Sequence, residues 1–227
     1  MRNILLILGA IAALAVIAVA AIEYFGAPGQ DEIRGPGSQA ASPAGAGAPE
    51  PLETEIGADE FIIGDANAPV TIVEYASLSC SHCARFHLDT LPNLKKAYID
   101  TGKVRLVYRD FPLDRPSLRG SMMARCAGRA RFFGFIDTLY KRQASWSGAN
   151  DPVAALARIG RLGGLGKSAF DACMKNKAIE DQVLAVRLKG EKKFGVNATP
   201  SFIVNGRLYA GALTFEEFDR ILAPLVN

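Results

Sequence analysis

The sequence predicts an α/β domain in which a long helical stretch interrupts a set of short strands. Residues 71–75 are β-branched, aromatic and mostly apolar, as in a buried strand, and helical spacing begins at Cys80. From about residue 116 to 194 the apolar period stays helical, and two short strand-like runs then flank Asn205-Gly206. We therefore expect one domain at residues 58–227, with a helical insertion at about 115–192.

Two further segments precede this domain. Residues 4–22 are uncharged and almost all apolar, which is close to the roughly 20 residues of a membrane-spanning helix. The run ends in Ala18-Val-Ala20, a small-x-small pattern, so residues 1–25 are either a cleaved signal peptide or a retained membrane anchor. The early positive charge of Arg2 predicts that the remainder is exported in both cases. Residues 26–57 are rich in Gly, Pro, Ala and Ser and predict a flexible linker.

The charge of the chain excludes few functions. Its formal net charge is +3, and the predicted domain holds 24 basic and 17 acidic residues, a balance of +7. These charges are scattered and are not interleaved with aromatic residues in one stripe, so we expect no nucleic acid partner. A mildly basic surface also suits a position near an anionic membrane.

The elements of the domain follow in order. After the first strand, apolar residues repeat at helical spacing from Cys83 to Leu94, and residues 104–108 read as the second strand. Within the insertion, helix starts are expected at Asp151-Pro152 and at Ser168, and breaks at residues 147–148 and 163–164. Residues 201–204 and 207–209 predict a hairpin, and Thr214 caps a last amphipathic helix.

The motif Cys80-Ser-His-Cys83 lies where the first strand gives way to a helix. Unpaired N–H groups and the positive end of the helix dipole favour a thiolate there. A redox-active dithiol is one interpretation, because residues i and i+3 share a helix face and their sulfurs can close a small ring. A metal site is the second, with Cys80, Cys83 and His87 as ligands of a tethered copper chaperone. Two inert buried cysteines are the third.

Cys126 and Cys173 both lie in the helical insertion, 47 residues apart. An unpaired thiol in an exported protein is exposed to misoxidation, so we expect a structural disulfide between these two cysteines. The alternative is a pair of buried thiols that pack as small hydrophobic residues.

Several motifs together resemble a known family. They are Val-Glu-Tyr-Ala-Ser-Leu-Ser-Cys-Ser-His-Cys, then Val-Tyr-Arg-Asp-Phe-Pro, the helical insertion, and Val-Asn-Ala-Thr-Pro-Ser-Phe-Ile-Val-Asn-Gly. In this order they are similar to the DsbA-like thiol:disulfide oxidoreductases of the thioredoxin superfamily, over residues 58–227. The resemblance implies a thioredoxin-like fold with an inserted helical domain. The sequence differs from the best-known oxidases at Ser81, where they have Pro, and at Thr199, where they have Val.

The resemblance also implies roles for the residues of the motif. Cys80 corresponds to the attacking cysteine and Cys83 to the buried resolving cysteine. His82 is expected to stabilise the Cys80 thiolate. Glu74 matches an acidic residue beneath the active site that relays the proton of Cys83, although an ordinary buried strand carboxylate explains it as well.

Thr199-Pro200 matches the family's cis-proline loop, which binds the substrate as an added strand. The alternative for this proline is an ordinary trans residue at the start of a strand.

The expected function follows from these roles. It is an exported, periplasmic or otherwise extracytoplasmic oxidoreductase that introduces or exchanges disulfides in unfolded or reduced exported proteins. An isomerase or reductase with the same dithiol remains an alternative, because the direction depends on the membrane redox partner that reoxidises or reduces the pair. We expect no cofactor and no bound metal, and membrane attachment through residues 4–22 if they are retained.

Overall fold

The computed structural model describes residue 52 and residues 54–226. Within this part of the chain, no helix combines the length and the apolar character that crossing a membrane requires. The hydrophobic segment predicted at residues 4–22 and most of the linker predicted at 26–57 lie outside the described residues.

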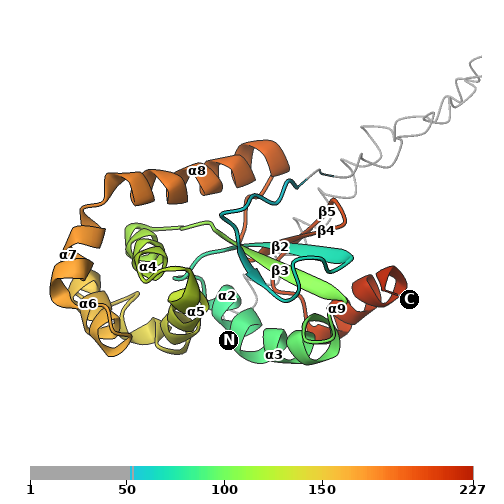
Figure 1. The fold of residues 1–227 in the computed structure, drawn as a ribbon, viewed down its shortest axis with the longest axis horizontal. Helices are drawn as coiled ribbons and strands as arrows, with labels where there is room; N and C mark the ends of the chain where they lie inside the picture. Colours follow the sequence, from blue (N-terminus) through green and yellow to red (C-terminus); the bar gives the residue numbers. More distant parts are fainter. Residues whose placement is uncertain (1–51, 53, 227) are drawn as a thin grey trace, which may run out of the picture. The chain divides into compact units, whose positions relative to one another are not determined.

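Five strands form one sheet in the order β1-β3-β2-β4-β5 (Figure 1). The central strands β2 and β3 are parallel, and the other neighbours are antiparallel. The strands predicted at residues 71–75 and 104–108, and the hairpin around Asn205-Gly206, are confirmed, whereas β1 has only three residues, too few for a sequence pattern to reveal. The strands are β1 (Phe61–Ile63), β2 (Val70–Ala76), β3 (Val104–Asp110), β4 (Ser201–Val204) and β5 (Arg207–Ala210).

Parallel neighbours need a crossover, and the helical stretch between β2 and β3 provides it. This stretch alternates α-helix with two wider π-helical turns. Pro92 lies in the first turn of α3, just after the first π turn, where its lack of an N–H removes one regular helical hydrogen bond. Its parts are α2 (Ser81–Arg85), η1 (Phe86–Thr90), α3 (Leu91–Leu94) and η2 (Lys95–Ile99). The remaining helices are α4 (Arg115–Cys126), η3 (Arg129–Arg131), α5 (Phe132–Lys141), η4 (Gln143–Ser145), α6 (Pro152–Leu162), α7 (Lys167–Met174), α8 (Lys177–Phe194), α9 (Phe215–Leu222) and η5 (Ala223–Leu225).

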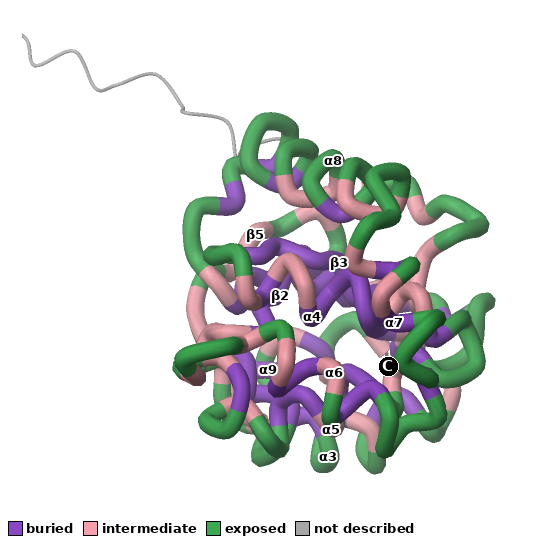
Figure 2. The backbone as a smooth tube through the Cα atoms, turned by 90° about the vertical axis from the view of Figure 1, so that its left-hand side faces the viewer, coloured by how far each residue is buried: buried purple, intermediate pink, exposed green. Residues whose placement is uncertain are grey.

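Helices cover both faces of the sheet (Figure 1). The helical stretch before β3 and α9 pack on one face through an apolar cluster that includes Phe86, Phe202 and Phe218. Helix α8 covers the other face, where Tyr75 and Phe194 pack together. Figure 2 accordingly shows β2 and β3 as buried, while most of α8 is exposed on its outer side. Both central strands are largely buried on both faces because helices cover both faces.

Gly190 allows α8 to lie close to the sheet. A Cβ at this position would come within 2.6 Å of the Tyr75 ring, closer than any side chain tolerates. The hydroxyl of Tyr75 in turn accepts a hydrogen bond from the buried guanidinium of Arg109.

The insertion predicted at about residues 115–192 comprises α4 to α8, and α4 to α7 pack in one apolar cluster around Trp146 that also includes Leu78, Cys83 and Tyr108. The helix start predicted at Asp151-Pro152 is confirmed in α6. The side chain of Asp151 accepts a hydrogen bond from Ala154 N–H, and Pro152 lies in the first turn. The capping box at Thr214 is confirmed as well. The helix predicted to start at Ser168 is present as α7 but begins one residue earlier, at Lys167, with the extended Gly166 as its N-cap and no side-chain cap.

Candidate active site

Cys80 stands at the junction of β2 and α2. It is the N-cap residue of α2 with extended backbone angles, φ −79° and ψ 120°, so its side chain faces the free N–H groups of the first helical turn. Its thiol is partly exposed and donates a hydrogen bond to the carbonyl oxygen of Thr199 at 3.2 Å. This is the strand-to-helix position that the sequence predicts for the motif.

The surroundings of Cys80 lower the pKa of its thiol from 9.0 to about 5. The largest cause is a hydrogen bond from the Cys83 thiol, and the backbone N–H groups of Cys83 and His82 add to it, while partial burial opposes them. The hydroxyl of Thr199 also contributes, although its oxygen makes no hydrogen bond of ordinary geometry in this structure. A thiolate at Cys80 therefore predominates at neutral pH.

Cys83 has the opposite environment. Its side chain is 0% exposed, and burial raises the pKa of its thiol far above the ordinary value, with further increases from Cys80 and from the negative charge of Glu74. The two thiols of one short motif thus differ strongly in pKa. In such a pair the more acidic sulfur can act as nucleophile or leaving group, while the other stays protonated.

His82 lies on the surface, and its Nδ1 is 3.1 Å from the guanidinium of Arg85. What His82 supplies to the Cys80 sulfur in this structure is its backbone N–H. A role for the imidazole in stabilising the thiolate stays a prediction.

Glu74 and His87 form a buried pair beneath the redox motif. The Nε2 atom of His87 lies 3.0 Å from both carboxylate oxygens of Glu74, and the imidazole stacks on Tyr140 at 4.4 Å between ring centroids. Glu74 is 0% and His87 8% exposed. Among the described residues, no three side chains of His, Cys, Asp or Glu are grouped to hold a metal ion, so the copper-chaperone alternative gains no support.

The loop before β4 passes beside Cys80. The Thr199-Pro200 peptide bond is cis, and β4 begins at the next residue. Since the Thr199 carbonyl faces the Cys80 thiol, 119 residues away in the chain, the fold brings the two motifs of the family resemblance together.

Comparison with known proteins agrees with this geometry. Residues 57–223 match the family model described as Thioredoxin. Among solved structures, Wolbachia pipientis alpha-DsbA1 is 31% identical, with a TM-score of 0.70 over 74% of this chain and 92% of that one. The chain belongs to the DsbA-like branch of the thioredoxin family. BdbD from Bacillus subtilis, at 19% identity and a TM-score of 0.64, shares the fold.

The rickettsial relatives of this DsbA-like chain are longer than it is. A Rickettsia bellii protein, provisionally named a protein-disulfide oxidoreductase, is 35% identical over 156 residues, which are 67% of this chain and 59% of that protein. The chain thus spans little more than half the length of the rickettsial relatives that it matches. Disulfide bond formation protein D of Bacillus subtilis is 24% identical over 173 residues.

The helical insertion of this DsbA-like chain supplies contacts to the redox motif that the sequence does not indicate. Ser117 Oγ accepts a hydrogen bond from Leu78 N–H at 3.0 Å, and the Tyr140 hydroxyl donates to the carbonyl of Ser77 at 3.4 Å. The side-chain amide of Gln143 reaches the same turn. Each partner is between 39 and 65 residues away in sequence, so no local pattern could have identified them.

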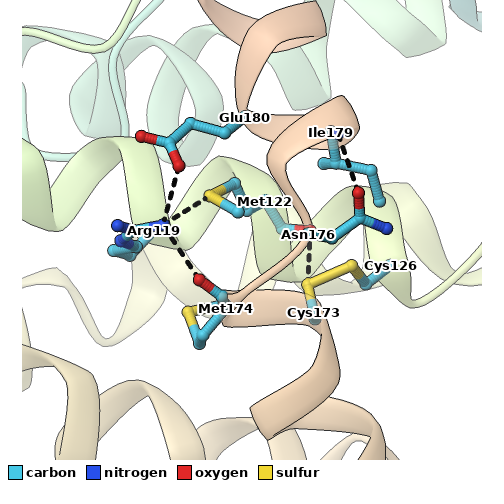
Figure 3. The surroundings of a disulfide bond; sticks show 8 residues. All are labelled: Arg119, Met122, Cys126, Cys173, Met174, Asn176, Ile179 and Glu180. Carbon is cyan, nitrogen blue, oxygen red and sulfur yellow. Dashed lines mark hydrogen bonds and ion pairs between the residues drawn. A yellow bond between two sulfur atoms is a disulfide. The ribbon is translucent and has the colours of Figure 1, made fainter.

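Cys126 and Cys173 are joined in the structure, as the sequence analysis expects (Figure 3). The bond links the end of α4 to α7, with Cα atoms 6.0 Å apart. Beside it, the guanidinium of Arg119 donates to the carbonyl of Met174 and pairs with Glu180 at the start of α8 (Figure 3). The disulfide and the arginine together connect three helices of the insertion.

Proposed function

We propose that this chain is an extracytoplasmic thiol:disulfide oxidoreductase that introduces disulfides into exported proteins through Cys80 and Cys83. The observation that carries the proposal is the difference in acidity between the two thiols, with a pKa of about 5 at Cys80 and a strongly raised pKa at Cys83. Membership of the DsbA-like branch and the names of the curated relatives support it.

The reaction begins with the Cys80–Cys83 disulfide. A substrate thiolate attacks the Cys80 sulfur, the Cys80–Cys83 bond breaks, and Cys83 leaves as a thiolate that takes up a proton. A second substrate thiolate then attacks the substrate sulfur of the mixed disulfide, and Cys80 leaves as a thiolate. The substrate has lost two electrons to the protein. A low pKa makes Cys80 a good leaving group and stabilises the reduced protein, so it favours oxidation of the substrate.

Two further roles belong to the proposal. The backbone beside Thr199 pairs with an extended substrate segment while its sulfur reacts, since the Thr199 carbonyl already faces Cys80. Glu74 passes the proton to and from Cys83, because its buried carboxylate acts on that thiol through its charge.

The proposal also includes the cellular setting. The hydrophobic residues 4–22 direct the domain out of the cytoplasm, and a membrane redox partner reoxidises the Cys80–Cys83 pair after each turnover. Reduced exported proteins are the substrates.

The test is the reduction potential of the Cys80–Cys83 couple in the full chain, equilibrated with glutathione redox buffers. We expect a potential more oxidising than the roughly −220 to −260 mV of cytosolic glutathione. A potential below that range would show a reductase and contradict the proposed direction.

A further inference from the structure

The turn that presents Cys80 is held by the helical insertion, and one side chain of the insertion reaches Cys80 itself. The amide nitrogen of Gln143 lies 2.7 Å from the carbonyl oxygen of Leu78 and 3.0 Å from that of Cys80. A carbonyl oxygen only accepts hydrogen bonds, so the NH₂ end of the amide must face both of them. Its two N–H donors match the two acceptors.

Gln143 is itself held in place. It begins η4 one residue beyond the end of α5, and its carbonyl accepts hydrogen bonds from the N–H groups of Trp146 and Ser147 at 3.2 and 2.9 Å. The indole of Trp146 is fully buried in the core of the insertion and donates to the carbonyl of Leu139. The amide is therefore presented by a rigid part of the insertion, which lowers the entropy lost in fixing it.

The two carbonyls that Gln143 binds control where the Cys80 sulfur lies. The Cys80 carbonyl also accepts the first hydrogen bond of α2, from Ala84 N–H at 3.1 Å. As long as this carbonyl points along the helix, Cys80 keeps its extended N-cap angles and its sulfur faces the N–H groups of His82 and Cys83. If the turn relaxes, the sulfur moves away from these donors.

We propose that Gln143 is a positioning residue for disulfide exchange, which holds the turn before α2 so that Cys80 reacts as a thiolate. The inference rests on the proposed role of Cys80 as the attacking cysteine. It assigns the helical insertion a part in the chemistry of the motif, carried by a side chain 63 residues from Cys80.

The test is the pH profile of Cys80 alkylation in the reduced full chain. Gln143→Met removes both N–H donors at nearly constant length, and Gln143→Asn keeps the amide but withdraws it by one methylene. Gln143→Lys keeps donors at this position. Gln182→Met, the same change at an exposed glutamine of α8, is the matched control. The melting temperature of each variant is measured in parallel.

We expect Gln143→Met to raise the midpoint of the alkylation profile by about 1 pH unit, which is a roughly tenfold loss of thiolate at pH values below the wild-type midpoint of about 5. Gln143→Asn should raise the midpoint as well, whereas Gln143→Lys should not raise it above the wild-type value. Gln182→Met should leave it unchanged.

A midpoint that stays at the wild-type value in a folded Gln143 variant, with only the melting temperature lowered, overturns the inference, because a merely structural role gives that result. A wild-type midpoint near the ordinary value of 9.0 would instead refute the proposed role of Cys80. The two failures are therefore distinguishable.

Discussion

The two cysteine pairs of this chain differ in sequence separation, in their place in the fold and in the surroundings of their sulfurs. Cys80 and Cys83 are free thiols three residues apart, at the junction of a strand and a helix. Cys126 and Cys173 are 47 residues apart and are joined across two helices of the insertion. At the first pair one sulfur faces N–H donors while the other is buried next to a carboxylate, so their acidities diverge. Reactivity therefore comes from asymmetry around the sulfurs, and the pairing of the second pair from the packing of helices.

The largest expected effect separates the two sulfurs of the reactive pair. Cys80→Ser should abolish exchange completely, whereas Cys83→Ser should accumulate mixed disulfides, because the trapped adduct has lost its intramolecular exit. Adducts are measured by non-reducing gel electrophoresis and mass spectrometry after mixing the reduced variant with an unfolded substrate that contains a disulfide, which the Cys80 thiolate attacks to form the mixed disulfide and release one substrate thiolate. Equal accumulation on both variants would contradict the assigned roles.

The structural pair should affect stability and leave the chemistry alone. Replacing both Cys126 and Cys173 by Ser should lower the free energy of unfolding by roughly 4 kcal/mol, the loop-entropy value for their separation. The measurement is urea unfolding of the full chain, with the Cys80 alkylation profile as the control. A shift in the pH midpoint of that profile would show that the two pairs are coupled, and the contrast between them would fail.

Glu74 should matter to only one of the pairs. Glu74→Gln removes the carboxylate that acts on Cys83, so decay of the mixed disulfide by attack of Cys83, the reverse of the first step, should slow by on the order of 10²-fold if Glu74 carries the proton. Rapid-mixing measurement of adduct decay across pH checks this, with Glu216→Gln on the surface of α9 as the matched control. Decay at the wild-type rate would leave Glu74 as a structural partner of His87.

The smallest effect is the pH dependence of stability. The pKa of Cys80 is about 5 in the folded reduced protein and 9.0 as the ordinary value, so its thiolate stabilises the fold fully above pH 9 and not at all below pH 5. Between pH 5 and 8 the reduced protein should gain stability relative to the oxidised protein as pH rises, because Cys83 stays protonated in this window.

The gain should stay below about 1.4 kcal/mol per pH unit, the value for one fully linked proton, since Cys80 is partly exposed. Thermal unfolding of both redox forms across this pH range measures it. A reduced form that loses stability relative to the oxidised form from pH 5 to 8 would contradict the lowered pKa.

Much of the fold was predictable because its signals are local. The run at residues 71–75 predicts a buried strand, and Asn205-Gly206 predicts the hairpin, through patterns only a few residues long. The helix start predicted at Ser168 was off by one residue, since α7 has Gly166 as its N-cap and a glycine offers no capping side chain for a sequence pattern to detect. At the site, sequence indicated Cys80, Cys83, Glu74 and the Thr199-Pro200 loop, but it suggested His87 as a metal ligand and left Gln143 unnoticed.

The sequence by itself determined where a strand meets a helix at Cys80, because hydrophobic periodicity and helix-terminal N–H groups depend on neighbouring residues alone. Only the tertiary structure decided what surrounds that sulfur. The Thr199 carbonyl and the Gln143 amide meet the motif through packing of elements distant in sequence, and a 3.6-residue or 2-residue period carries no information about which distant side chains will touch. The physical reason is that short-range patterns set which face of an element is buried, whereas the contacts within that buried face follow from how the sheet, the crossover helix and the insertion fit together.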